Sequence, residues 1–371
     1  MGFSTTERVA PAHRIDFLDG LRGLAILMVI GLHYFTQIDH VPQSEFYHEN
    51  SPLRFGYFGV ELFFIISGYV IFMTLDKSSN FFRFIVQRWI RLFPAMLLAT
   101  ILIWTLSHWL PYRPGGIPRL IDLIPGLSLA GANFVSAATG IDTDGLERGF
   151  WSLYVEFRFY LMFGILFFVV GRQRAFQLLF ILSLMLLAAI EVTSLHGGAW
   201  AARAESLCGK MLIGFYLPWF LFGMYAYLYH FKQHRWLPVV LIGNAVAYNV
   251  ESTGTVIVTL ALPLLVFLLF VLPPLQSIFR TRLLLFFGAV SYPLYLINDS
   301  LGRGMIRGGY EALGDRVPFE LISLFVLAVI LVPAWIMAKY LEPKIQRWLK
   351  RMLLGTTRTS PAPAVIAAKE A

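Results

Sequence analysis

The sequence predicts an all-α fold, a polytopic membrane helix bundle of about ten transmembrane helices. Hydrophobic residues make up 57% of the 371 residues and charged residues only 14%, whereas soluble domains contain roughly 25% charged residues. Apolar runs of the length needed to cross about 30 Å of hydrocarbon also recur along the chain. These two observations place most of the chain within a lipid bilayer.

Ten apolar runs are candidates for the membrane helices. They cover residues 21–38, 55–75, 92–110, 150–170, 175–190, 209–229, 236–249, 254–272, 283–301 and 318–339. The run 236–249 is the weakest candidate, because it is short and contains Asn244. The first 20 residues lack the apolar core of a signal peptide, so the first helix is expected to remain as an anchor.

Lysine and arginine are concentrated in alternate loops between these runs, as expected when those loops face the cytoplasm. The alternation predicts cytoplasmic positions for both termini. We therefore divide the chain into a cytoplasmic segment (1–20), a transmembrane domain (21–340) and a final part (341–371). That final part reads as a basic juxtamembrane stretch suited to anionic headgroups, followed by a disordered cytoplasmic tail.

Composition also excludes several classes of function. The formal net charge is +8, but the basic residues lie in short loops and form no contiguous basic and aromatic surface, so we predict no nucleic-acid partner. Cys208 is the single cysteine, which excludes an internal disulfide and a cysteine-based metal cluster. The histidines lack metal-ligand spacing, so no metal site is predicted.

The first apolar run carries two ionisable residues of special interest. It begins at Asp19 as "DGLRGLAILMVIGLHYF", with Arg22 and, eleven residues later, His33. At about 1.5 Å per residue the two lie roughly 16 Å apart, so Arg22 reaches one aqueous face while His33 lies near mid-bilayer. An ionisable residue at that depth is a functional-site hypothesis by default. The alternative is a histidine hydrogen-bonded between helices for packing alone.

The second run, "GYFGVELFFIISGYVIF", places Gly59, Phe63 and Ser67 on one helix face at four-residue intervals. A packing seam of small residues is the structural interpretation of that face. Glu61, an acid near the expected outer end of the run, is harder to explain by packing. Glu61 and Ser67 are therefore candidate cavity residues.

Arg88 and Arg91 precede the third run one turn apart, just before Pro94, which is expected to bend or start the membrane helix. Ordinary positive-inside charge would account for both. The functional alternative is a phosphate clamp, because the planar guanidinium binds phosphate through two parallel hydrogen bonds. Arg22 lies on the same predicted side and could join them.

The fourth run contains Trp151, Ser152, Glu156 and Arg158 inside or at the edge of an otherwise apolar segment. Glu156 and Arg158 are two residues apart, so they point to different sides of a helix and each is expected to pair with another helix. A glutamate beside a neutral histidine could orient the imidazole ring for general base chemistry. A structural ion pair is the open alternative for Glu156.

Two further segments contain candidate residues. The ninth run includes Tyr292, which can hydrogen-bond across helices, and is expected to end with Asn298 and Asp299 at the outer face. The long loop 111–148 is moderately apolar but broken by Pro125 and glycines, so we expect a re-entrant or interfacial segment on the outer side. Loops of this length are usually functional, and a lid or an acceptor-binding element is one interpretation.

Together these residues resemble the acyltransferase-3 family of integral membrane O-acyltransferases. The resemblance runs from about Arg14 to Lys344 and rests on several motifs in the same order. They are Arg22 with His33; Gly59, Phe63, Phe64, Ser67 and Gly68; Arg88, Arg91 and Pro94; Trp151, Ser152, Leu153 and Glu156; "SYPLYLI"; and Glu342 with Pro343. The chain departs from the family pattern at Phe157, where members often have an acid, and at Asn298, where they often have a histidine.

The resemblance implies transfer of an acyl group, an acetyl group in the first place, from cytoplasmic acyl-CoA to a hydroxyl of a sugar, polysaccharide or glycosylated metabolite. It implies a multi-pass protein of the bacterial inner membrane. In this interpretation Arg22, Arg88 and Arg91 hold the donor phosphates, and His33 removes the acceptor proton or carries the acyl group. Glu156 would orient or balance the imidazole.

Two alternatives from other classes remain. Buried ionisable residues also occur in transporters and flippases, although the sequence has no internal repeat and no paired broken helices of the kind common in transporters. A non-catalytic membrane sensor of the same fold is the other alternative.

Overall fold

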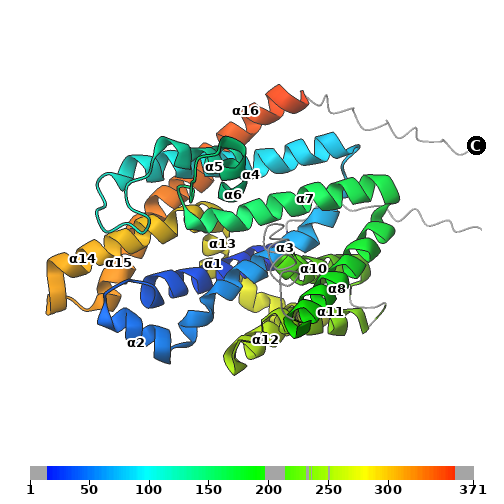
Figure 1. Ribbon diagram of the computed structural model, residues 1–371, viewed down its shortest axis with the longest axis horizontal. Helices are drawn as coiled ribbons and strands as arrows, with labels where there is room; N and C mark the ends of the chain where they lie inside the picture. Colours follow the sequence, from blue (N-terminus) through cyan, green and yellow to red (C-terminus); the bar gives the residue numbers. More distant parts are fainter. Residues whose placement is uncertain (1–14, 197–213, 231–233, 235, 250, 356–371) are drawn as a thin grey trace, which may run out of the picture.

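The computed structural model describes residues 15–196, 214–230, 234, 236–249 and 251–355, and within these ranges all regular structure is helical (Figure 1). The α-helices are α1 (Asp16–Thr36), α2 (Pro42–Asn50), α3 (Phe58–Leu75), α4 (Phe81–Ser107), α5 (Leu123–Ser128), α6 (Ala132–Thr139), α7 (Trp151–Val170), α8 (Arg172–His196), α10 (Leu217–Tyr229), α11 (Trp236–Tyr248), α12 (Thr253–Val271), α13 (Arg282–Ile297), α14 (Arg303–Leu313), α15 (Phe319–Ile336) and α16 (Glu342–Leu354). Two π-helical segments, Asn298–Gly302 and Met337–Leu341, join α13 to α14 and α15 to α16. The predicted all-α class is confirmed.

Eight helical segments among the described residues are long and apolar enough to cross a membrane, and they correspond to eight of the ten predicted runs. The other two runs contain α10 and α11, which have 13 residues each. The beginning of the run 209–229 lies outside the described residues, as do residues 1–14 and 356–371. The cytoplasmic placement of the two termini stays a prediction.

Two helical segments extend beyond the apolar runs that predicted them. Helix α4 begins at Phe81 rather than near residue 92, because the Asn80 side chain caps it by accepting a hydrogen bond from the Arg83 amide at 2.8 Å. Pro94 therefore lies inside a 27-residue helix. The ninth run does not end at Asn298, because the π-helical segment continues it into α14 and buries Asn298 completely.

The loop 111–148 folds into short helices rather than into a span. Helices α5 and α6 contain only 6 and 8 residues, too few to cross about 30 Å of hydrocarbon. Helix α5 packs on α4. Contact is close at Gly126, where an added Cβ would lie 2.6 Å from the Thr100 hydroxyl. The side of the membrane on which this loop lies stays a prediction.

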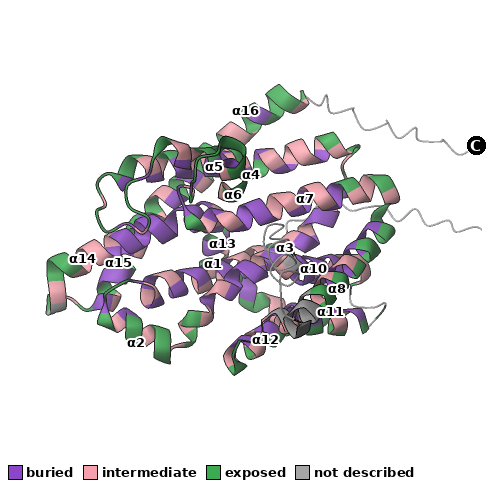
Figure 2. Ribbon diagram, viewed as in Figure 1, coloured by how far each residue is buried: buried purple, intermediate pink, exposed green. Residues whose placement is uncertain are grey.

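Helices α1, α3 and α13 form the centre of the bundle, and burial is concentrated on them (Figure 2). Helix α1 packs closely on α13. A Cβ added at Gly288 would lie 1.9 Å from the Asp19 carbonyl oxygen, and one at Gly23 would lie 2.1 Å from the Leu284 carbonyl oxygen. Small residues allow this approach of two membrane helices, which fixes the position of Arg22 and His33 relative to α13.

We expect Gly288→Ala to destabilise the protein, because the added methyl group collides with backbone and must separate α1 from α13. Overpacking of this kind typically costs about 1–3 kcal/mol. A lower thermal unfolding temperature and a lower yield of monodisperse protein in detergent would report it. The matched control is Gly243→Ala on α11, where an added Cβ meets no atom within 4 Å. Equal behaviour of the two variants would contradict the close contact.

Candidate functional site

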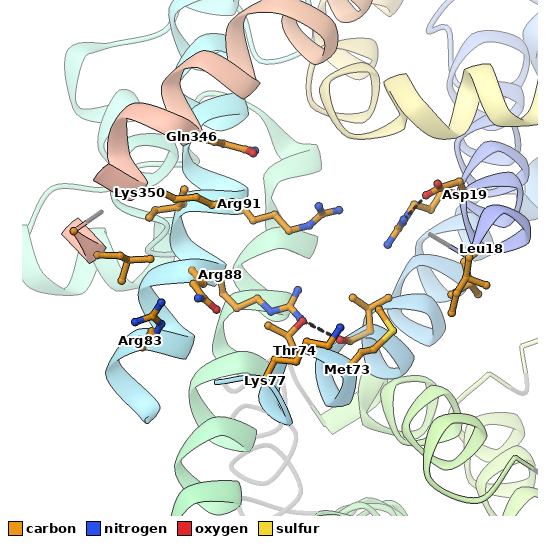
Figure 3. A pocket seen from close by; sticks show the side chains of 17 residues that line it. Leu18, Asp19, Met73, Thr74, Lys77, Arg83, Arg88, Arg91, Gln346 and Lys350 are labelled. Atoms are coloured by element: carbon orange, nitrogen blue, oxygen red, sulfur yellow. Dashed lines mark hydrogen bonds and ion pairs between the residues drawn. The ribbon is translucent and has the colours of Figure 1, made fainter. Parts of the chain in front are cut away.

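A basic cavity of about 720 Å³ lies between α1, α3, α4 and α16 (Figure 3). Its described lining includes six basic side chains, Arg22, Lys77, Arg83, Arg88, Arg91 and Lys350. The acidic side chain in the lining is Asp19, which already forms an ion pair with Arg22 at 2.6 Å. The excess of positive charge makes this cavity suitable for an anionic ligand.

Arg88 is held rigidly at the inner part of the cavity. Its side chain is only 4% exposed, and it donates hydrogen bonds to the Val70 carbonyl at 3.2 Å and to the Thr74 hydroxyl. Its guanidinium also lies over the Tyr160 ring, 4.9 Å from the centroid. Arg91 is exposed and lies within electrostatic range of both Arg22 and Arg88. Three like charges therefore converge, an arrangement that an anion would stabilise.

A narrow passage of about 80 Å³ continues from the basic cavity and shares Arg22, Val70, Arg88 and Arg91 with it. The passage is also lined by Ser67, Ser152, Glu156, Tyr160, Tyr292 and Tyr295. Tyr292 donates a hydrogen bond to the Leu92 carbonyl at 2.8 Å, and Ser152 donates to the Tyr295 hydroxyl at 2.8 Å. A volume of about 80 Å³ is too small for a nucleotide.

Glu156 accepts hydrogen bonds from Ser67 on α3 and from Tyr160, one turn further along α7. It lies within electrostatic range of Arg22 and Arg88. The expected contact of Glu156 with His33 does not form, because these two hydroxyls and the arginine charges hold the carboxylate in the passage. Glu156 thus serves as a counter-charge to the converging arginines.

The polar partner of His33 is Asn298, whose Oδ1 lies 2.6 Å from Nδ1 of the imidazole. Asn298 also donates from Nδ2 to the Tyr295 carbonyl at 2.7 Å, which turns its Oδ1 toward the histidine. An amide oxygen can only accept, so the hydrogen of the neutral imidazole must lie on Nδ1. The lone pair on Nε2 is then free to accept a proton.

The segment that holds Asn298 is the π-helical turn Asn298–Gly302, a feature often found at functional sites. Asp299 in this turn accepts a hydrogen bond from Arg303 at 3.1 Å. Both residues lie within electrostatic range of His33. A buried polar network of Asn298, Asp299 and Arg303 therefore lies beside the histidine, on the side away from Arg22, Arg88 and Arg91.

Two polar cavities of about 830 and 790 Å³ lie beyond this network and share Asp39, Arg148 and Asp299. We call them together the polar vestibule. Its lining also includes Gln37, His48, Arg113, Asp122, Glu147, Trp151 and Ser300. The loop 111–148 and the segment after α1 supply most of these residues.

The order of the lining residues along the helices places His33 between the passage and the vestibule. Ser152 lines the passage and Trp151 lines the vestibule. Likewise, Tyr295 lines the passage and Asp299, one turn later, lines the vestibule. His33 contacts Asn298, which lies between these last two residues. His33 itself lines neither cavity, and a ligand in the passage and another in the vestibule would lie at opposite ends of the segment that holds its partner Asn298.

Glu147 connects the loop 111–148 to the π-helical turn. It is only 5% exposed and accepts hydrogen bonds from the Ser300 hydroxyl and, at 3.3 Å, from the Ser300 amide. Burial, together with repulsion from Asp299, raises the pKa of the Glu147 carboxyl. Arg113 donates to the Leu146 carbonyl beside it. Sequence reasoning missed the contact between Glu147 and Ser300, for which the only signal was an acid three residues before the fourth run.

The remaining predicted site residues are distributed around these cavities. Glu61 is 6% exposed, and its Oε2 has no hydrogen-bond partner within the described ranges. It does not line the passage. Arg158 packs against the loop 111–148, because a Cβ added at Gly131 in that loop would lie 2.9 Å from a guanidinium nitrogen of Arg158. Trp151 packs against Tyr216 at a centroid distance of 5.0 Å. Thus Glu61 and Arg158 are not brought to the same place as His33.

Comparison with known proteins agrees with this arrangement. A family model described as an acyltransferase domain matches residues 15–339, which is most of the chain. The chain belongs to the acyltransferase-3 family. The resemblance inferred from the sequence motifs is thereby confirmed.

Among the relatives of this family member, an O-acetyl transferase of Shigella phage Sf6 is 26% identical over 41% of this chain and 46% of that protein. The peptidoglycan O-acetyltransferase OatA of Listeria monocytogenes is 27% identical over 49% of this chain and 29% of OatA. The O-acetyltransferase OatA of Staphylococcus aureus is 28% identical over 51% of this chain and 31% of that protein. The matches thus span less than half the length of each of these relatives. No solved structure matches the chain.

The contact between Asn298 and His33 predicts that the neutral imidazole carries its hydrogen on Nδ1. Solid-state NMR of protein labelled with ¹⁵N-histidine would identify this tautomer, with His33→Gln assigning the signal. We expect Asn298→Ala to remove the preference for one tautomer. Asn244→Ala is the matched control, because Asn244 is also a buried asparagine, bonded to Ser183 at 3.0 Å. A histidine hydrogen found on Nε2 in the unchanged protein would refute the assignment.

Proposed function

We propose that the protein transfers an acyl group, in the first place acetyl, from acyl-CoA to a hydroxyl of a carbohydrate acceptor. The observation that carries the proposal is that the basic cavity continues into the narrow passage, while His33 bonds Asn298 on the segment that leads from the passage to the polar vestibule. The names of the relatives support it, since they describe O-acetyl transfer and, for the Listeria protein, peptidoglycan as the material modified.

The basic cavity fits the charged end of acyl-CoA. Arg22, Arg88 and Arg91 would bind phosphate oxygens where the cavity narrows, because arginine presents paired donors to phosphate. The passage then admits only the extended pantetheine arm. From Arg22 to His33 the rise along α1 is about 16 Å, a distance that an extended chain of this kind can cover. The thioester would thus arrive beside the imidazole while the phosphates remain at the membrane surface.

His33 would act as general base. Its Nε2 takes the proton of the acceptor hydroxyl as the oxygen attacks the thioester carbonyl carbon. The C–S bond then breaks, and the proton on Nε2 passes to the departing thiolate to give free CoA and the ester. Asn298 keeps the imidazole in the required tautomer and orientation throughout. Transient acylation of Nε2 is the alternative use of the same free nitrogen.

The polar vestibule would receive the acceptor. Its carboxylates can accept hydrogen bonds from sugar hydroxyls, while Arg148 can donate to them. Trp151 adds an aromatic face with a polar edge. The donor and the acceptor would therefore enter from opposite ends of the bundle and meet at His33.

A transporter or flippase is the second candidate, because cavities at both ends of the same helices are also expected for a translocation path. Release of free thiol separates the two functions. The proposed enzyme cleaves acetyl-CoA when the coenzyme is supplied to purified protein with an extract of cell-envelope carbohydrate, whereas a transporter leaves the thioester intact.

We expect His33→Ala to lower the transfer rate by about 10² to 10⁴-fold, the usual contribution of a general base. Membrane insertion and folding should be preserved. Thiol release measured with the extract above would report the loss. His108→Ala is the control, since His108 is an exposed histidine at the C-terminal end of α4 that contacts the Trp104 carbonyl. A loss below about tenfold in His33→Ala would favour the packing role instead.

A further inference from the structure

The basic cavity holds more positive charge than its three inner arginines supply. Lys77, Arg83 and Lys350 also line it. They come from the turn after α3, from the first turn of α4 and from α16, so segments far apart in sequence converge on one space. Within the described part of the chain none of these three side chains forms an ion pair. We call the three the outer cations.

The outer cations differ from the inner arginines in the space that they line. None of them lines the passage, and Lys77 and Lys350 are exposed, whereas Arg88 is almost fully buried. In Figure 3, Arg83 and Lys350 lie on the side of the cavity away from Asp19, with Arg88 and Arg91 between. Arg83 and Lys350 therefore offer the ligand a cationic group separate from the inner arginines, with Lys77 beside Arg88 in the same view.

The covalent structure of acyl-CoA determines which of its phosphates can bind to the inner arginines and which to the outer cations. The pantetheine arm is joined directly to the diphosphate, while the 3′-phosphate is on the far side of the ribose. Because the passage is too small for the nucleotide, an arm directed into it would leave the diphosphate at the inner arginines that the two cavities share. The 3′-phosphate then extends toward the outer part of the cavity.

On the basis of the proposed function, we propose that Lys77, Arg83 and Lys350 bind the 3′-phosphate of the donor and make the protein select CoA over 3′-dephospho-CoA. Lysine is a common phosphate ligand, and a phosphate monoester carries more charge than a diester. Helix α16 is thereby part of the donor site.

The face of α16 that meets the cavity is defined by Gln346 and Lys350, which are four residues apart and so lie on one side of the helix. Lys344, on the same helix, does not line the cavity and is exposed. It therefore provides a control of equal charge and similar exposure. The phosphate of an anionic lipid is the other source of the same ligand chemistry.

The test is equilibrium binding of CoA and of 3′-dephospho-CoA to the full chain in nanodiscs, measured by calorimetry. We expect the unchanged protein to bind CoA at least about tenfold more tightly, as loss of a charged phosphate contact implies. Lys350→Ala and Arg83→Ala should weaken CoA binding and leave dephospho-CoA binding unchanged. Lys350→Arg should retain the preference, and Lys344→Ala should alter neither affinity.

Equal weakening of both ligands by Lys350→Ala, or no weakening of either, would overturn the inference while leaving the proposed function in place. Nanodiscs of phosphatidylcholine alone and with phosphatidylglycerol distinguish the lipid source. An effect of Lys350→Ala that requires phosphatidylglycerol would assign the outer cations to lipid and overturn the inference. Failure of the unchanged protein to bind either coenzyme would overturn it together with the proposed function.

Discussion

The close packing of α1 against α13 is the constraint on which the site depends. The glycines at positions 23 and 288 let the two backbones approach so closely that a Cβ at either position would collide with a carbonyl oxygen of the other helix. That approach brings His33 to Asn298, although 265 positions separate them in sequence. A wider spacing would leave both polar groups without their partner inside a membrane, where unpaired polar groups are costly.

Charge is distributed unevenly along the same helices. The basic cavity has six cations and one carboxylate in its described lining, whereas the vestibule at the other end is lined by eight carboxylates and four arginines. Glu156 lies between, held by two hydroxyls and facing the inner arginines. An anionic donor is attracted to the first end and repelled from the second. The two substrates of a transfer reaction would thus be kept on separate routes until they meet at His33.

Much of the bundle and part of the site could be predicted from the sequence. Length and apolarity identify the spans, because a helix must be about 20 residues long to cross the bilayer. The spacing from Arg22 to His33 and the one-turn spacing of Arg88 and Arg91 follow from helix geometry alone. These local relations placed the arginines correctly at one cavity.

Contacts between distant helices could not be predicted in this way. The partner of His33 depends on the register of α1 against α13, and neither the glycine contacts nor the π-helical turn has a local signal strong enough to fix that register. The sequence places Glu156 beside the histidine only by analogy with a carboxylate that orients an imidazole, whereas Ser67 and Tyr160 donate hydrogen bonds to it elsewhere. The contact of Glu147 with Ser300 joins a loop to a helix and has no periodicity to reveal it.

The central claim is that the donor enters at the end of the bundle where Arg22, Arg88, Arg91 and α16 meet. Proteoliposomes test it directly when acetyl-CoA is supplied to one face at a time. The orientation of the protein would be read from a Lys344→Cys label on α16, in a Cys208→Ala background, with a membrane-impermeant maleimide. We expect thiol release only when acetyl-CoA is on the face that carries α16. Release only from the opposite face would contradict it.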